Sequence, residues 1–220
     1  SAFEPVTPTF SGFNGVVDTL AVRADHQWSA RHTSRISYEF ERERYLSDAA
    51  PVNLALAWRA DITQDSHAVS VHHELRFDAL HLSASVRAQR FGLDDVALVP
   101  SQRAPFAAAS FRAPPGAWTA DVAATRWLSL SGTRLRVHAG NAYRAPAMFE
   151  RAGVSFGSRG YGVFGDPGLE PERSVAADAG IDQTFSKGRG VISVTWFHTR
   201  LSRVISFQSL DPTTDSLGRT

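Results

Sequence analysis

The fold is decided by one alternating stretch, Leu80-His81-Leu82-Ser83-Ala84-Ser85-Val86-Arg87-Ala88-Gln89. Every second side chain in it is apolar, and the side chains between are polar. Successive side chains of a β-strand point to opposite faces, so a period of two predicts a strand with one apolar and one polar face. The stretch is longer than the roughly five or six residues usual in soluble sheets. It has about the length, roughly 9–11 residues, with which a tilted strand crosses a bilayer.

The same alternation recurs in both directions from this stretch. We expect about eight long strands, near residues 15–28, 34–45, 67–78, 80–91, 117–129, 134–144, 174–185 and 191–208. The dominant period of two predicts an all-β protein. Alternation alone does not separate a membrane barrel from a soluble β-sandwich, because the polar face meets water in both.

The predicted connections alternate in length. Short ones fall at 29–33, 78–79, 131–133 and 186–190, and long ones at 46–66, 92–116 and 145–173. Short turns at one end and long loops at the other are typical of outer-membrane barrels. We therefore predict an antiparallel up-and-down segment of a transmembrane β-barrel, with short periplasmic turns and long extracellular loops. Residues 52–62 also alternate, but a membrane strand there would break the rhythm, so we interpret them as part of an extended loop hairpin.

Aromatic side chains lie towards the ends of the predicted strands. They are Trp28, Tyr45, Phe77, Phe91, Trp127, Tyr143 and Phe185. Amphipathic rings prefer the boundary between membrane and water, so this placement is typical of the aromatic girdles of membrane barrels. The alternative is that aromatic residues are simply common in strands.

Composition narrows the class of protein without naming it. The 220 residues carry a net charge of +1, with 23 basic and 22 acidic side chains interspersed, which argues against a nucleic-acid partner. Cysteine is absent, as suits an exported barrel and many soluble proteins. No stretch reaches the roughly 18 apolar residues of a membrane helix. The beginning, Ser1-Ala2-Phe3-Glu4-Pro5, lacks the features of a signal peptide, so we expect a processed or incomplete chain.

Two motifs after the sixth predicted strand point to a family. The first is Tyr143-Arg144-Ala145-Pro146, followed by Met148-Phe149-Glu150, and the second is Gly165-Asp166-Pro167-Gly168-Leu169-Glu170-Pro171-Glu172-Arg173-Ser174. Together with the strands around them, they resemble the β-barrel of TonB-dependent receptors. In that family an aromatic-basic-Ala-Pro stretch precedes a Leu-aromatic-Glu element, and a Gly-Asn-Pro-rich segment closes the following loop. Asp166 in place of Asn, Gly168 at a variable position and Met148 in place of Leu are mild departures.

The resemblance implies a partial receptor barrel over residues 1–220. An N-terminal plug domain, the segment that binds TonB and the last strands are not recognisable here, and eight strands are about a third of a barrel of about 22. The implied function is TonB-energised uptake of a scarce nutrient of the ferric siderophore, haem or cobalamin class, at the bacterial outer membrane. The implied partners are an extracellular nutrient chelate, the TonB complex through the missing plug, and outer-membrane lipid. No enzymatic activity and no cofactor are implied.

The long loops supply the candidate ligand-binding residues. They are Arg144, Phe149, Tyr161 and Phe164, because anionic chelates and flat apolar cofactors are bound by cations and aromatic rings. For the motif residues we predict a structural role: Tyr143, Arg144, Ala145, Pro146, Glu150, Gly165, Asp166, Pro167, Leu169, Pro171, Glu172, Arg173 and Ser174. Asp166-Pro167-Gly168 is a turn sequence, and Pro171 favours an extended Glu170. The second motif therefore predicts a rigid return from the long loop into a strand.

Other patterns are weaker. Residues 153–157 match a nucleophile elbow and residues 160–165 a dinucleotide fingerprint, but both require a following helix that this sequence does not predict. His72 and His73 are adjacent and so point to opposite faces of a strand, where they cannot share a metal. Asp178 and Asp182 are about 13 Å apart along a strand, too far for an acid–base pair. We predict no catalytic residue and no metal ligand.

Arg134, Arg136 and His138 lie on one strand face. The resemblance implies that these basic side chains pair with carboxylates of the plug. The alternatives to the receptor are a soluble β-sandwich binding module and a small self-contained outer-membrane barrel.

Overall fold

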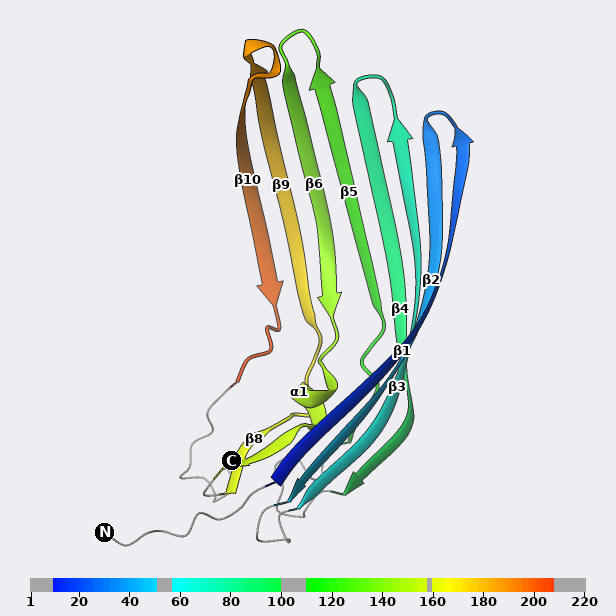
Figure 1. Cartoon of the computed structure of the whole chain (residues 1–220), viewed down its shortest axis with the longest axis vertical. Helices are drawn as coiled ribbons and strands as arrows, with labels where there is room; N and C mark the ends of the chain where they lie inside the picture. Colours follow the sequence, from blue (N-terminus) through cyan, green and yellow to red (C-terminus); the bar gives the residue numbers. More distant parts are fainter. Residues whose placement is uncertain (1–9, 51–56, 100–109, 158–159, 208–220) are drawn as a thin grey trace, which may run out of the picture.

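The computed structural model describes residues 10–50, 57–99, 110–157 and 160–207 (Figure 1). Its strands are β1 (Phe10–Ser29), β2 (His32–Ala50), β3 (Trp58–Arg76), β4 (Leu80–Val99), β5 (Ala117–Leu128), β6 (Thr133–Arg144), β7 (Val154–Gly157), β8 (Gly160–Phe164), β9 (Glu172–Phe185) and β10 (Gly190–Ser202). Two short helices, α1 (Met148–Ala152) and η2 (Ser186–Gly188), complete the elements.

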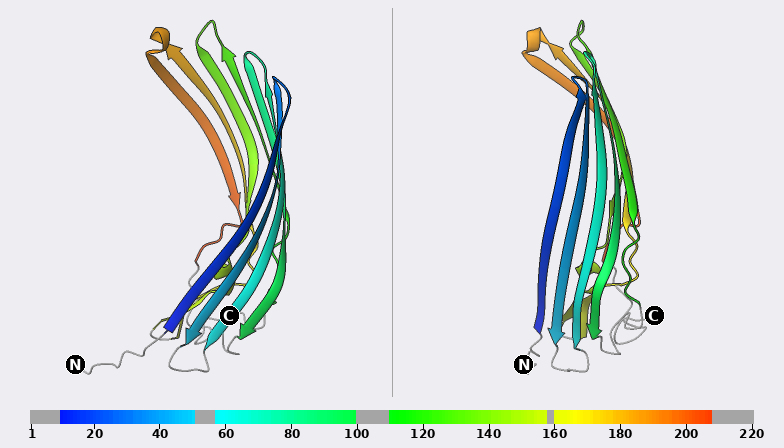
Figure 2. Two further views of the ribbon diagram at one scale, coloured as in Figure 1. Left: turned by 45° about the vertical axis from the view of Figure 1, so that its right-hand side comes forward. Right: turned by 90° about the vertical axis from the view of Figure 1, so that its right-hand side faces the viewer.

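Eight strands form one antiparallel sheet in the order β1-β2-β3-β4-β5-β6-β9-β10. Each strand pairs with the one that follows it in this order, so the sheet is an up-and-down meander. The sheet is bent along its length, and β1 and β10 form its two edges (Figure 2). The prediction of an all-β, antiparallel barrel segment with about eight long strands is confirmed.

The two ends of the sheet differ, as the sequence predicts. Tight connections join β1 to β2, β3 to β4, β5 to β6 and β9 to β10 at what we call the turn end, uppermost in Figure 1. Gly132 and Gly188 have φ of 68° and 89° there, a left-handed conformation that favours glycine. The longer connections gather at the opposite end, which we call the loop end.

One face of the sheet carries a continuous apolar belt. The register places Val22 beside Tyr38 and Tyr38 beside Val69, and the row continues across the sheet. The belt consists of Leu20, Val22, Ile36, Tyr38, Val69, Val71, Val86, Val122, Val137, Ile181, Val194 and Trp196, all of which are exposed. We call this the outer face and the opposite one the inner face. An exposed apolar surface that crosses every strand of a sheet indicates contact with an apolar environment.

Four strands run far beyond the belt towards the loop end. β1, β2, β3 and β4 have 20, 19, 19 and 20 residues. Past Phe40 and His67 the outer positions become charged, and Arg42 and Arg44 form ion pairs of 2.8 Å with Asp65 and Asp61. These ion pairs hold the pKa of both carboxyls below the ordinary value. The belt therefore ends where water-exposed sheet begins.

This extension corrects the predicted loop 46–66. β2 continues to Ala50 and β3 begins at Trp58, because Tyr45 pairs with Ile62 and Ala49 with Trp58. The expected hairpin exists, but it is the continuation of β2 and β3 rather than a separate loop structure; residues 52–56 lie outside the described part. β4 likewise runs to Val99, well into the predicted loop 92–116. The register between β3 and β4 shifts between Thr63 and Gln64, where Asp94 of β4 is the extra residue.

Two other predicted boundaries were wrong. β1 begins at Phe10 rather than near residue 15. β10 ends at Ser202 rather than at 208, because Arg203 adopts a φ of 57° and breaks the extended backbone. Beyond it the Ile205 amide donates a hydrogen bond to Glu172 instead of joining a strand ladder.

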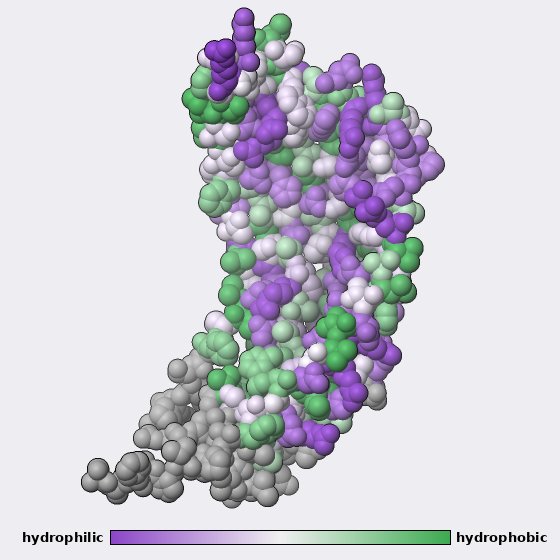
Figure 3. All heavy atoms as spheres, viewed as in Figure 1, coloured by the Kyte–Doolittle hydropathy of each residue, from purple (hydrophilic) through white to green (hydrophobic). Residues whose placement is uncertain are grey.

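The connection between β6 and β9 folds back over the inner face at the loop end. Its helix α1 and hairpin β7–β8 pack against β2 and β3 in a small cluster, the mouth core. The buried members of the mouth core are Tyr45, Trp58, Ala60, Ile62, Met148, Ala152 and Val154. On the face towards the viewer in Figure 3, hydrophilic residues lie in patches along the strands, and hydrophobic ones gather near the loop end. No helix in the described part of the chain is long and apolar enough to cross a membrane.

Candidate functional site at the loop end

Arg144, the last residue of β6, forms hydrogen bonds with both ends of the connection between β6 and β9. Its Nε donates to Glu172 Oε2 at 2.7 Å, at the start of β9, and its Nη1 donates to Glu150 Oε2 at 3.0 Å, in α1. Glu150 also accepts the Ala147 amide at 2.7 Å, which caps the first turn of α1. One guanidinium thus joins a strand end, a helix and the next strand start.

Glu172 has a second partner from another segment. The Ile205 amide donates to its Oε1 at 2.7 Å, so the chain that leaves β10 is held at the same carboxylate. The ion pair with Arg144 and this amide hydrogen bond hold the pKa of Glu172 at about 2. Glu172 therefore carries a negative charge throughout the neutral and mildly acidic range.

The second motif builds the return into β9. Asp166 Oδ1 accepts the Gly168 amide at 2.7 Å, and the Leu169 amide donates to the Asp166 carbonyl at 3.2 Å. Side-chain capping of this kind is why Asp serves here as well as Asn. The Arg173 guanidinium lies 5.3 Å from the centre of the Tyr143 ring, whose hydroxyl donates to the Pro115 carbonyl at 2.6 Å. These contacts hold the two motifs together at the loop end, and the structural role that the sequence assigns to them stays a prediction.

The four candidate ligand residues occupy different environments. Arg144 is ion-paired as described. Phe149 is 36% exposed and packs edge-on against Phe13 of β1, with ring centres 5.3 Å apart. Phe164 packs against the mouth core, and the side chain of Tyr161, which lies in β8, is outside the described part. Contact of these residues with a ligand stays a prediction.

Arg151 of α1 is a feature that the sequence did not single out. It is 2% exposed, its guanidinium lies 4.0 Å from the centre of the Phe111 ring, and its Nη2 donates to the Arg112 carbonyl. Among the described residues, its Nε and Nη1 have no hydrogen-bond partner. Burial lowers the pKa of Arg151. A local sequence pattern cannot identify Arg151, because the residues that bury it come from strands distant in the sequence.

Charges on the inner face pair across strands. Arg134 Nη2 lies 2.7 Å from Asp182, and Arg136 lies 3.4 Å from the same carboxylate. His138 Nδ1 lies 3.0 Å from Asp178. Neighbouring β9 supplies these carboxylates, because the register sets Arg134 beside Asp182 and His138 beside Asp178. Pairing of the same basic residues with carboxylates of a plug stays a prediction.

The weaker motifs have no catalytic geometry. Residues 154–157 form strand β7 after the end of α1, the reverse of the strand–turn–helix order of a nucleophile elbow. Residues 160–164 form strand β8, so no helix N-terminus stands there for a phosphate. His72 bonds to Glu74 and His73 to Ser34, on opposite faces. Within the described ranges, no three His, Cys, Asp or Glu side chains converge as metal ligands would.

The comparisons with known proteins agree with this architecture. The family described as TonB dependent receptor-like, beta-barrel matches residues 4–219, nearly the whole chain. The chain belongs to this family. No curated protein sequence matches it.

Two solved structures of receptors and transporters share the fold. One is a double mutant of the hemophore receptor HasR of Serratia marcescens in complex with its hemophore HasA and heme, with a TM-score of 0.59 and 17% identity over 88% of this chain and 34% of that one. The other is the copper transporter OprC, with a TM-score of 0.61 and 15% identity over 84% of this chain and 30% of that one. This TonB-dependent receptor chain thus spans about a third of their length.

Proposed function

We propose that this chain is part of a bacterial outer-membrane receptor that imports a scarce nutrient in a TonB-dependent way. The observation that carries the proposal is the apolar belt on the outer face of an up-and-down sheet of the receptor family. Lipid would cover the belt, while the inner face, with its cross-strand ion pairs, would face a wet or plugged lumen. The turn end would then lie in the periplasm and the loop end outside the cell.

The nutrient belongs, in this proposal, to the ferric siderophore, haem or cobalamin class, and it would be bound at the loop end. Phe149 supplies exposed aromatic surface at the loop end, and Phe164 packs against the mouth core there. Tyr161 is a candidate from the sequence alone. One of the two solved structures is a complex with heme and the other is a copper transporter, so this fold serves more than one kind of cargo. TonB would act through a plug domain, which the described strands do not include.

Uptake by cells that produce the protein tests the proposal. The gene that encodes this chain, with its native flanking sequence, is expressed in an outer-membrane receptor-deficient bacterium. Accumulation of labelled haem, ferric siderophores and cobalamin is then measured with functional TonB and with a TonB deletion. We expect one of these nutrients to accumulate only when TonB is present. Accumulation of none, or equal accumulation without TonB, would contradict the proposal.

The soluble β-sandwich is the second candidate, and the packing disfavours it. A sandwich buries the apolar faces of two sheets against each other. Here twelve large belt residues are exposed, and among the described elements no second sheet covers them. Extraction distinguishes the two: a receptor stays in the membrane fraction until detergent is added, whereas a sandwich module appears in the soluble fraction.

A further inference from the structure

Arg126 of β5 is an unpaired cation on the apolar outer face, near the turn end. It follows Val122 of the belt by four residues on the same strand, so its side chain projects from the same face. The side chain is exposed and has no hydrogen bond or ion pair with another described residue. By contrast, Arg42 pairs with Asp65 on the water-exposed extension of the same face.

The neighbouring positions on the outer face are all apolar. The register sets Leu80 of β4 and Leu135 of β6 beside Arg126. Along β5 the neighbours on the same face are Ala124 and Leu128. Leu128, which is 38% exposed, lies between Arg126 and the turn. The guanidinium therefore emerges from within the apolar surface rather than beyond its margin.

Polar side chains elsewhere on the outer face near the turn end bond to one another. Trp28 Nε1 donates to Ser34 Oγ at 2.9 Å, and Ser34 Oγ lies 2.7 Å from His73 Nδ1. In the described part of the chain Arg126 has no such partner. An unpaired charge that faces hydrocarbon is costly, so the arrangement calls for an anion from the surroundings.

We propose that Arg126 binds the phosphate of a phospholipid in the periplasmic leaflet of the outer membrane. The inference rests on the proposed function, which sets the belt in lipid and the turn end in the periplasm. Arg126 is two residues from the end of β5, about 7 Å along the strand, so its guanidinium can reach the headgroups while its methylene groups stay on the apolar surface.

The chemistry of the group favours a lipid phosphate over a free ion. A planar guanidinium donates to two phosphate oxygens at once, and the phosphodiester of a phospholipid supplies them at headgroup depth. The acyl chains of the same lipid would lie along the belt that surrounds the arginine. Headgroup and chains thus match the charge and the apolar surface together, which a free phosphate ion does not.

Native mass spectrometry of the whole protein tests the site. The protein, with its native flanking sequence, is purified in mild detergent and titrated with phosphatidylglycerol, and the bound lipids are counted. In Arg126→Leu the new side chain matches its apolar neighbours, so the barrel should still fold, which the shift in gel mobility on heating checks. We expect the first phosphatidylglycerol to bind about tenfold more weakly to this variant than to the wild type, because charge-assisted hydrogen bonds are lost.

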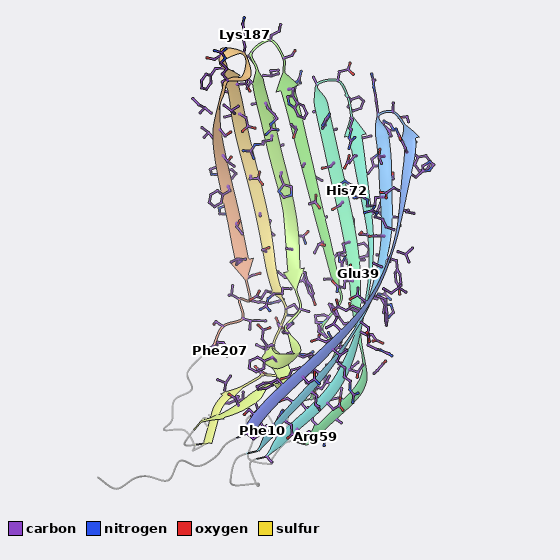
Figure 4. All side chains as sticks on the ribbon, viewed as in Figure 1. Phe10, Glu39, Arg59, His72, Lys187 and Phe207 are labelled. Carbon is purple, nitrogen blue, oxygen red and sulfur yellow. The ribbon has the colours of Figure 1, made fainter. Side chains whose placement is uncertain are left out.

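Lys187→Gln is the matched control. Lys187 lies in η2, exposed at the turn end (labelled in Figure 4), so this substitution removes an equal charge from the same end of the molecule but outside the apolar surface. Lipid binding should not change. Diacylglycerol, which lacks the phosphate, should bind equally to the wild type and to Arg126→Leu, and millimolar inorganic phosphate should not displace phosphatidylglycerol.

Equal binding of phosphatidylglycerol by the wild type and Arg126→Leu would overturn the proposal. An equal loss in Lys187→Gln, or displacement of the lipid by inorganic phosphate, would overturn it too. These outcomes leave the proposed function standing, because they are seen in a barrel that needs detergent. A wild-type protein that dissolves without detergent and binds no lipid would instead contradict the proposed function together with the lipid site.

Discussion

Gly165 lies against the backbone of α1, and a Cβ built on it would come within 2.7 Å of the carbonyl carbon of Arg151. Its amide donates to the Gly153 carbonyl at 2.7 Å, which ties the start of the second motif to the end of the helix. At the scale of residues, the loop end is thus ordered by side chains and backbone groups whose partners lie in other elements. Close approach of this kind is one reason for a glycine at the first position of the motif.

Gly165→Ala should loosen the segment between β6 and β9. The added methyl group meets backbone rather than a flexible side chain, so we expect a loss of about 1–3 kcal/mol in the local stability of that segment. Hydrogen exchange of residues 147–171 in the purified protein measures it. Gly15→Ala is the matched control, because nothing lies within 4 Å of its added Cβ. Equal exchange in the two variants would contradict the packing described here.

Glu172 gives the loop end a dependence on pH. Its pKa is about 2 in the folded protein and lies lower than its ordinary value of 4.5 because of Arg144 and the Ile205 amide. The stabilisation is therefore fully present above about 4.5 and is lost as the pH falls from there through about 2. Proteolysis near residues 203–207 with pepsin should accelerate over this range. In Glu172→Gln the same cleavage should already be fast at pH 4.5 and should change less below it.

The motifs allowed the sequence to locate this region but not its contacts. Arg144, Glu150 and Glu172 were predicted to be structural, and the structure supplies the reason in a shared guanidinium. The Ile205 amide and the buried Arg151 were not foreseen, because their partners are set by tertiary packing rather than by spacing.

At the scale of elements, the period of two located all eight sheet strands, since each strand has one apolar face. It failed at the strand ends. Residues 58–62 alternate as a strand does, but their apolar side chains, Trp58 and Ile62, are buried against α1 rather than exposed on the belt. Periodicity does not reveal which surface covers an apolar face, so the continuation of β3 was predicted to be part of a loop.

Trp58 is the residue through which β3 holds the folded-back segment. It is 6% exposed, and its Nε1 donates to the Ala152 carbonyl at 3.0 Å. Trp58→Ala should weaken the docking of α1 by about 3–5 kcal/mol, the usual range for loss of a buried aromatic ring. Faster hydrogen exchange in α1 and β7, with unchanged exchange in β9, is the expected result. Trp118→Ala, at a position 70% exposed, should leave α1 unaffected, and similar effects of both would contradict docking through Trp58.

At the scale of the whole molecule, the sheet has two unpaired edges. β1 presents 20 residues and β10 presents 13, and in the described part of the chain neither strand has a partner beyond the sheet. Backbone N–H and C=O groups at such edges find no hydrogen bonds in lipid, which is why only closed barrels cross membranes as strands. Eight strands can close a small barrel, but here the sheet is an open arc of a much wider one.

Residues 1–220 produced alone should therefore fail to insert as a stable barrel. The apolar belt would drive the chain into detergent or lipid. The backbone N–H and C=O groups at the two open edges would either lack hydrogen bonds or pair with other copies of the chain. We expect aggregates or mixed oligomers on refolding in detergent, without the shift in gel mobility on heating that a closed barrel gives. A sharp, heat-modifiable monomer with strand-rich circular dichroism would contradict this. It would mean that β1 and β10 can meet, and the small self-contained barrel would then replace the arc as the structure of the isolated chain.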